Sequence, residues 1–166
     1  MSRLSGEDQA NIIRYWKEKK NFIEAFEIKL SSDYTSEGED LTLIACGPMV
    51  AEAMRAAYIL KEEYNLESRI LNIHTLKPID KKAILKAAEE TNIIITCEEH
   101  QVGGFGNIVA GVIARNKKYS TSLLLDMIGV EDRFGESGEP WELTKVFALT
   151  AEHITQRAKK LYEKKK

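Results

Sequence analysis

The stretch from Ile93 to Ala114, IIITCEEHQVGGFGNIVAGVIA, joins a short apolar run to a helix-like segment through a cluster of glycines. The β-branched run inside Asn92–Cys97 is typical of a strand that is buried on both faces. Glu98, Glu99 and His100 follow it, and the glycines after them permit a tight turn into a helix. A buried strand that leads into a helix predicts one unit of a parallel α/β sheet.

The same unit recurs along the chain. Three further apolar runs, each with a helical pattern after it, predict the other strands: Leu41–Cys46, Ser68–Leu76 and Thr121–Gly129. Pro48 and Pro140 suit the first turn of a helix, and Asp80 suits an N-cap. Strand and helix therefore alternate four times, which predicts an α/β fold with helices on both faces of a mostly parallel sheet.

The N-terminal part of the chain has a different character. Ser31–Asp40 collects Ser, Asp, Gly and Glu without an apolar period, which predicts a loop. Before it, Ser5 with Asp8 resembles a capping arrangement, and apolar residues up to Trp16 fall on one helical face. We therefore expect an arm and linker over residues 1–36 and a compact domain over residues 37–166.

Composition excludes several classes of function. The 166 residues carry a formal net charge of -2 with acids and bases interspersed, so nucleic acid is not an expected partner. No apolar run approaches the roughly 20 residues that cross a bilayer, and the first residues lack the apolar core of a signal peptide, so no membrane contact is expected. Two cysteines at strand ends suit reduced thiols in the cytoplasm.

Several polar groups are expected at the carboxyl ends of the strands, where ligands of open α/β sheets bind: Cys46, His74, Cys97, Glu98, Glu99, His100 and Asp126. A nucleotide site would use Gly104 and Gly106 for a phosphate and Asp126 for a ribose. Against it, Val109 occupies the third glycine position and two glutamates precede the turn, so packing at the turn is the favoured interpretation.

Other chemistries receive weaker support from the sequence. The cysteines and histidines lack the short spacing of a zinc site. Cys97 could be a nucleophile with His74 or His100 as its base. The favoured interpretation is that Cys97 is a small buried residue that closes a strand. Glu98 or Glu99 with His100 could perform acid–base work or bind a partner surface, and the sequence leaves this open. Trp141 is expected to anchor its helix to the core.

Four segments, taken in order, resemble the C-terminal domain of transketolase. GEDLTLIACGPMVAEAMRAA (38–57) is similar to its opening strand, turn and helix, and ILNIHTLKPID (70–80) to its second strand. EEHQVGGFGNIVA (98–110) is similar to its glycine turn, and DRFGESGEPWELTKVFALTAEHI (132–154) is the most specific match. The resemblance covers about residues 28–162. Deoxyxylulose-phosphate synthases and 2-oxo acid dehydrogenase first components share the architecture.

The resemblance implies a three-layer sandwich with a five-stranded sheet, mostly parallel, and one antiparallel edge strand in the neighbourhood of Phe26–Leu30. It implies a part of a transferase of ketol groups in the pentose phosphate pathway. Thiamine diphosphate, a divalent metal such as Mg and the catalytic residues would belong to the thiamine-binding and pyrimidine-binding domains, which this chain lacks. No catalytic, cofactor-binding or metal-binding residue is therefore assigned to this chain, and the chain alone is expected to be inactive.

The remaining site expectation is a turn that serves as an interface or an anion-binding site, formed by Glu99, His100, Gly103, Gly104 and Gly106. In the resemblance, the partners are the other domains or subunit of the enzyme, and the assembly is a homodimer. Two alternatives stay open: a free-standing regulatory module that binds a nucleotide or similar anion, and the third domain of a 2-oxo acid dehydrogenase first component.

Overall fold

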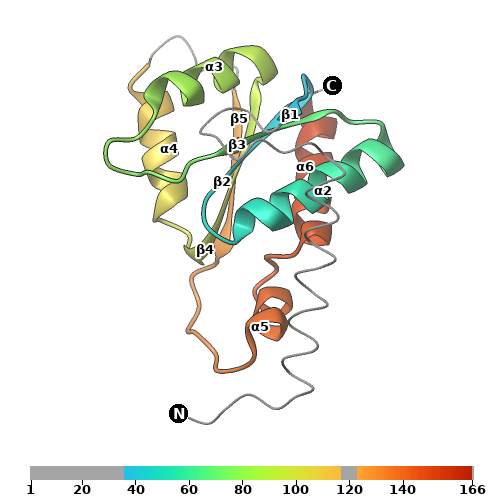
Figure 1. Ribbon diagram of the computed structural model, residues 1–166, viewed down its shortest axis with the longest axis vertical. Helices are drawn as coiled ribbons and strands as arrows, with labels where there is room; N and C mark the ends of the chain where they lie inside the picture. Colours follow the sequence, from blue (N-terminus) through green and yellow to red (C-terminus); the bar gives the residue numbers. More distant parts are fainter. Residues whose placement is uncertain (1–35, 117–122, 166) are drawn as a thin grey trace. The chain divides into compact units, whose positions relative to one another are not determined.

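The computed structural model describes residues 36–116 and 123–165. Its five strands form one sheet in the order β1-β3-β2-β4-β5 (Figure 1). The strand bounds are Ser36–Glu37 (β1), Leu41–Ala45 (β2), Ser68–Asn72 (β3), Ile93–Gln101 (β4) and Leu124–Val130 (β5). β1 pairs with β3 in the antiparallel sense, and the other pairs are parallel. The prediction of a mostly parallel five-stranded sheet with one antiparallel edge strand is confirmed.

Helices cover both faces of this sheet, which gives the expected three layers. Their bounds are Met49–Tyr64 (α2), Lys81–Thr91 (α3), Phe105–Ala114 (α4), Pro140–Val146 (α5) and Ala151–Lys165 (α6). α3 and α4 lie on one face and α2 and α6 on the other (Figure 1). None of the described helices combines the length and the apolar composition that crossing a bilayer requires.

The apolar runs that predict the strands form the core. Leu43, Ile44 and Ile94 are completely buried. Between the sheet and the α3–α4 layer, Ile44 and Ile94 pack in one cluster with Phe105 and Val109. Removing such a side chain from water contributes roughly 1.5–3 kcal/mol, so these contacts fix the end of the glycine turn against the sheet.

Local sequence signals place the helix ends. Asp80 caps α3 as predicted, because its carboxylate accepts a hydrogen bond of 3.0 Å from the Ala83 N–H. Pro140 begins α5, which is also as predicted. Asn65 and Asn92 end α2 and α3 in the left-handed conformation, which Asn tolerates better than most residues.

Three expectations need correction. The predicted loop Ser31–Asp40 contains β1, in which Ser36 lies opposite Ile70 of β3, so an antiparallel edge strand lies at residues 36–37. The segment Phe26–Leu30, the candidate for this strand, lies outside the described residues, and so does the expected helical arm. β4 continues to Gln101, because its polar end still pairs with β5. Trp141 does not anchor α5 to the core: it is 45% exposed, and α5 has no buried residue.

Candidate functional site

β3 lies on one side of β2 and the next strand in the chain, β4, lies on the other. This change of side makes the crevice between the carboxyl ends of the parallel strands β2 and β4 the default ligand position of the fold. β2 and β4 are neighbours in register, with Ala45 opposite Cys97. The helices that follow them, α2 and α4, lie on opposite faces of the sheet (Figure 1). Loops that diverge in this way open a crevice at the carboxyl edge. The predicted turn, Glu99–Gly106, lies at this edge.

Glu98 fills the anion position of the glycine turn from inside the protein. Its side chain is completely buried. One carboxylate oxygen accepts a hydrogen bond of 2.7 Å from the Phe105 N–H, and the other accepts one of 2.9 Å from the Gly106 N–H. These N–H groups begin α4, where the helix dipole favours a negative charge. The carboxylate therefore takes the place that a phosphate would take in a nucleotide-binding turn.

The local structure around the turn explains why glycine occupies three of its positions. A Cβ atom on Gly104 would lie 2.6 Å from a carboxylate oxygen of Glu98, and one on Gly106 would lie 2.7 Å from the Thr96 hydroxyl oxygen. Gly103 adopts φ +127, a conformation that L side chains rarely adopt. Close contacts therefore account for Gly104 and Gly106, and the backbone conformation accounts for Gly103.

The carboxylate that would bind the ribose of a nucleotide is also occupied. Asp126, the expected ribose acceptor, accepts hydrogen bonds of 2.7 and 2.5 Å from the Arg157 guanidinium. Partial burial acts to raise the pKa of Asp126, but the hydrogen bonds and charge of Arg157, helped by the Met127 N–H, outweigh it and lower the pKa. The carboxylate is thus held ionised in an ion pair between β5 and α6.

The charge of the crevice is negative. Glu99 is exposed, and a Cβ atom built on Gly47 at the end of β2 would lie 4.0 Å from its carboxylate. With Glu98 filling the turn and Glu99 beside it, a diphosphate would meet repulsion, and the Phe105 and Gly106 N–H groups at the start of α4 are already engaged by Glu98. The residues of the crevice therefore do not fit thiamine diphosphate or a nucleotide.

The two thiols at this edge are poor nucleophiles. Cys97 is completely buried, and desolvation raises its pKa well above the ordinary value, with smaller contributions from Cys46 and Asp126. Cys46 is partly buried; desolvation, followed by the charges of Glu98 and Glu99, raises its pKa to about 11. Because the thiolate is the reactive form, both side chains are almost entirely protonated at neutral pH.

The histidines do not join a catalytic or metal-binding cluster with these groups. His74 bonds Thr75 through its Nδ1 at 2.7 Å and lies in the exposed segment after β3. His100 is exposed near the end of β4. In the ranges 36–116 and 123–165, no group of three or more His, Cys, Asp or Glu side chains is arranged to hold a metal ion. Whether Glu99 and His100 contact a partner stays a prediction.

One structural role was missed from the sequence because it depends on residues far apart in the chain. Buried Glu52 on α2 accepts a hydrogen bond of 2.9 Å from the Ala151 N–H at the start of α6, 99 residues away. Glu98 and Glu52 are thus both buried carboxylates that accept hydrogen bonds from the N–H groups at the start of a helix, α4 and α6 respectively. The sequence contained one signal for the capping role of Glu98. The N-cap of α4 is Gly104, which has no side chain to accept a hydrogen bond, so an acceptor from another residue could be expected there.

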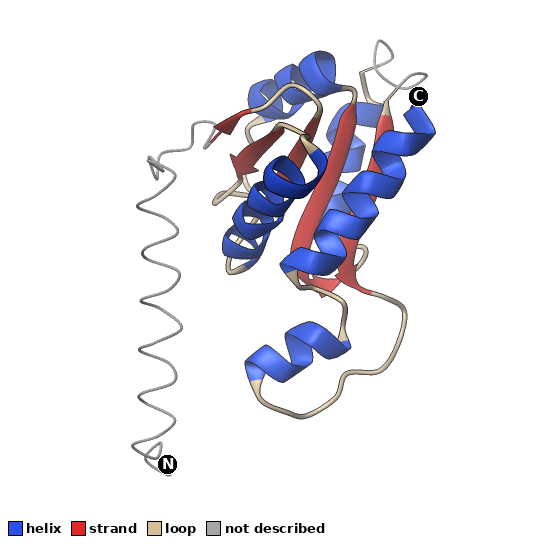
Figure 2. Ribbon diagram, turned by 90° about the vertical axis from the view of Figure 1, so that its right-hand side faces the viewer, coloured by secondary structure: helices blue, strands red, loops and turns tan. Residues whose placement is uncertain are grey.

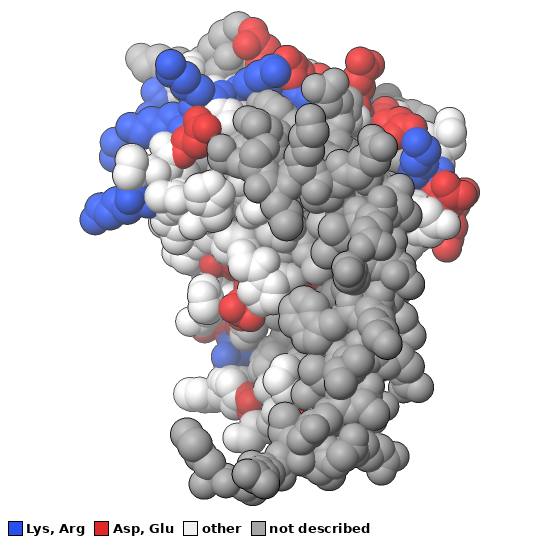
Figure 3. Space-filling view, viewed as in Figure 1, with Lys and Arg blue, Asp and Glu red and all other residues white. Residues whose placement is uncertain are grey.

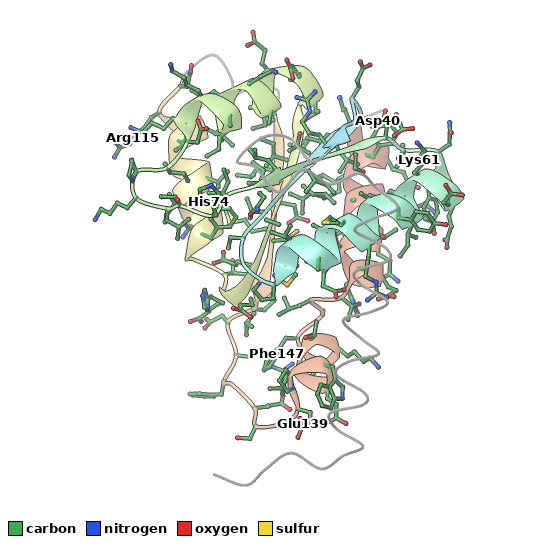
Figure 4. All side chains as sticks on the ribbon, in the orientation of Figure 1. Asp40, Lys61, His74, Arg115, Glu139 and Phe147 are labelled. Carbon is green, nitrogen blue, oxygen red and sulfur yellow. The ribbon has the colours of Figure 1, made fainter. Side chains whose placement is uncertain are left out.

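A second missed feature is an exposed apolar surface beyond the carboxyl edge. Phe134 is 97% exposed, and Trp141 and Val146 of α5 are each 45% exposed. We call these three residues the α5 patch. The loop after β5 and α5 itself extend away from the end of the sheet (Figure 2), in the region where Figure 4 labels Glu139 and Phe147. Three large exposed apolar side chains within residues 134–146 make this segment a candidate for contact with another molecule.

Comparisons with known proteins place the chain among transketolase-type proteins. The subunit SqwH of the 6-deoxy-6-sulfo-D-fructose transketolase from a Clostridium species is 38% identical over 130 residues, which are 78% of this chain and 39% of the relative. A 1-deoxy-D-xylulose-5-phosphate synthase from Desulforudis audaxviator is 38% identical over 123 residues, 74% of this chain and 19% of that protein. A split-gene transketolase, solved as an inactive beta4 tetramer, matches with a TM-score of 0.72 and 32% identity over 84% of this chain and 46% of its own.

The chain is much shorter than the transketolase sections and subunits that it matches. It covers 36% to 39% of their length. The family model described as the C-terminal domain of transketolase matches residues 31–154, which include all five strands and the start of α6. The chain therefore belongs to the transketolase C-terminal domain family.

Proposed function

We propose that this chain is the C-terminal part of a thiamine-diphosphate-dependent transketolase and that it supports the transfer of two-carbon ketol units between sugar phosphates by assembling with other polypeptide. The observation that carries the proposal is the filled turn. Glu98 occupies the position at the start of α4 where a diphosphate would bind, so the crevice of this domain is closed to anions from within.

The cofactor then belongs to partner polypeptide. Thiamine diphosphate supplies the electron sink for ketol transfer, and a divalent metal such as Mg holds its diphosphate; both would bind to thiamine-binding and pyrimidine-binding domains or to a subunit that carries them. This chain would contribute rigid contact surface. The free thiols Cys46 and Cys97 suit an enzyme of the cytoplasm.

The α5 patch is our candidate for the contact with that polypeptide. Phe134 and Trp141 present large apolar area, and aromatic side chains dominate the energy of protein interfaces. The exposed turn residues Glu99 and His100 lie at the same edge of the sheet and would form its polar rim. In the assembled enzyme we expect two copies of the complete active unit, related as a homodimer.

The test is reconstitution. The full chain is mixed with the two-domain partner subunit, thiamine diphosphate and Mg, and transfer of a ketol unit from a ketose phosphate to an aldose phosphate is measured. The expected result is activity in the mixture and none with either component alone. Trp141→Ser should reduce the activity, whereas Leu76→Ser, a matched change of a residue that is 42% exposed elsewhere, should not. Turnover by this chain alone, or no association with the partner, would refute the proposal.

A second candidate follows from the similarity to 1-deoxy-D-xylulose-5-phosphate synthases, of which one is 38% identical over 123 residues. In that case the same scaffold would serve an enzyme that forms 1-deoxy-D-xylulose 5-phosphate. The assembled enzyme separates the two possibilities, because formation of this product without ketol transfer would favour the synthase.

A further inference from the structure

The outer face of α3 and α4 carries a groove that is unrelated to the acidic crevice. Its volume is about 560 Å³, which lies in the range of small-molecule sites. Four apolar side chains line it, those of Ile79, Leu85, Ile108 and Val112, together with the polar Asn107 and Asn116. Ile108 is 40% exposed, which is unusual for an isoleucine of a helix that packs against the core. The groove thus offers apolar surface to a ligand.

The charged groups of the lining are both positive. Lys81 at the start of α3 and Arg115 at the end of α4 line the groove, and no Asp or Glu does. Across the described part of the chain, neither cation forms an ion pair with a carboxylate. Asp80, the acid next to Lys81, is engaged with the Ala83 N–H as the cap of α3. The groove is therefore electrostatically complementary to an anion.

Lys and Arg side chains are frequent on the surface around the groove, with some acidic side chains among them (Figure 3). Figure 3 shows Lys and Arg side chains gathered over the α3 and α4 corner of the molecule, and Figure 4 shows Arg115 directed outward there. A second copy of the chain packed face to face on this groove would bring Lys81 and Arg115 against the same cations. Self-association is thus disfavoured at this surface.

Gly111 keeps the groove open. It lies on α4 and lines the groove, and a Cβ atom built on it would meet no atom within 4 Å. A larger side chain at this position would therefore project into the open space and obstruct it. Gly106 on the same helix differs in this respect, because its Cβ position is blocked by Thr96 and Met127.

We propose that the α3–α4 groove is a binding site for an organic anion that has an apolar body and a phosphate, sulfonate or carboxylate head. The apolar body would lie on Ile108 and Val112, and the head would pair with Arg115 and Lys81. Arg115 is suited to this role because a guanidinium binds such oxyanions with two parallel hydrogen bonds. The site goes beyond the proposed scaffold function and does not depend on it.

The test uses the full chain labelled with ¹⁵N and the probe 1-naphthyl phosphate, followed by amide chemical shifts. Saturable shifts are expected for the backbone of residues 79–85 and 107–116. Arg115→Gln and Gly111→Leu should each raise the Kd at least about tenfold. Gly135→Leu is the matched control, since Gly135 also has open space at its Cβ position but lies outside the groove, and its Kd should equal that of the unchanged chain.

Two further probes test the chemical class. Uncharged 1-naphthol and inorganic phosphate should each bind at least about tenfold more weakly than 1-naphthyl phosphate, because each lacks one half of the interaction. Equal binding of either one would overturn the assignment. So would shifts centred on Gly103–Gly106, a Kd unchanged by Gly111→Leu, or the absence of saturable shifts up to about 10 mM probe. A variant spectrum that superposes outside the groove establishes that the fold is intact.

Discussion

Glu98 determines how the glycine turn behaves. Glutamate is almost never fully buried unless it is paired, and here two N–H groups at the start of α4 receive its two oxygens. A charged acceptor makes such hydrogen bonds roughly twice as strong as neutral ones. The same residue pattern that suggests an anion-binding turn in the sequence is therefore a helix cap whose acceptor comes from the preceding strand.

We predict that Glu98→Ala lowers the free energy of unfolding by about 2–4 kcal/mol, because it leaves two buried N–H groups unpaired and a cavity behind. Glu98→Gln keeps one good acceptor and should lose about 1–2 kcal/mol. Urea unfolding at neutral pH measures both. Glu99→Gln is the control: this neighbour is exposed, and its change should stay within about 0.5 kcal/mol. Equal stability of Glu98→Gln and Glu99→Gln would contradict the capping role.

A second prediction at this scale concerns Cys46. Its pKa is raised to about 11 by desolvation and then by Glu98 and Glu99. A raised pKa means that the thiolate is scarce below it, so the rate of alkylation by iodoacetamide should rise about tenfold from pH 8 to pH 9. Glu99→Gln removes one of the negative charges, lowers the pKa and should speed the labelling. Mass spectrometry locates the adduct, and Cys97 should stay unlabelled until the chain unfolds.

At the scale of the element, α4 holds two glycines with opposite requirements. Both lie within Phe105–Ala114, but Gly106 faces Thr96 and Met127 at less than 3 Å from its Cβ position, while Gly111 faces open space. Glycine within a helix costs about 0.5–1 kcal/mol relative to alanine. That cost is compensated by close packing at Gly106 and is uncompensated at Gly111.

Gly111→Ala should therefore raise the free energy of unfolding by about 0.5–1 kcal/mol, whereas Gly106→Ala should lower it by about 1–3 kcal/mol through the clash with Thr96 and Met127. The two variants change the same atoms in the same helix and so control for each other. Their midpoints in urea should move in opposite directions. A shift of both in the same direction would contradict the contrast between the packed Gly106 and the open Gly111.

The elements also show which features a sequence reveals. Local signals sufficed for α3, where Asp80 caps its own helix, and for β2, whose apolar run is completely buried. They failed for β1, because a strand of two residues contains no periodicity and exists through its pairing with β3. They failed likewise for the α6 cap, since Glu52 and Ala151 are 99 residues apart. Contacts between distant segments depend on the completed fold, and one sequence does not reveal them.

At the scale of the molecule, three surfaces with different chemistry surround one sheet. The carboxyl edge is acidic through Glu99, the α3–α4 groove is basic through Lys81 and Arg115, and the α5 patch is apolar. Of the candidate turn, Glu99, His100, Gly103 and Gly104 are exposed, whereas Gly106 is buried against Thr96 and Met127. That division could not be predicted from the sequence, in which all five residues lie within the eight positions 99–106.

The α5 patch yields a prediction that separates a contact surface from a core. Because Phe134 is 97% exposed and α5 has no buried residue, Phe134→Ser and Trp141→Ser together should change the free energy of unfolding of this chain by no more than about 1 kcal/mol. Phe105→Ser, at a buried aromatic of the α4 core, should by contrast cost about 3–5 kcal/mol. Urea unfolding gives these values.

Calorimetry with the two-domain partner subunit gives the affinity of the contact. The double variant should bind that partner at least about tenfold more weakly, since interface aromatics often contribute more than 1 kcal/mol each. A large loss of stability would mean that these residues pack within the chain, and unchanged affinity would place the contact on another surface.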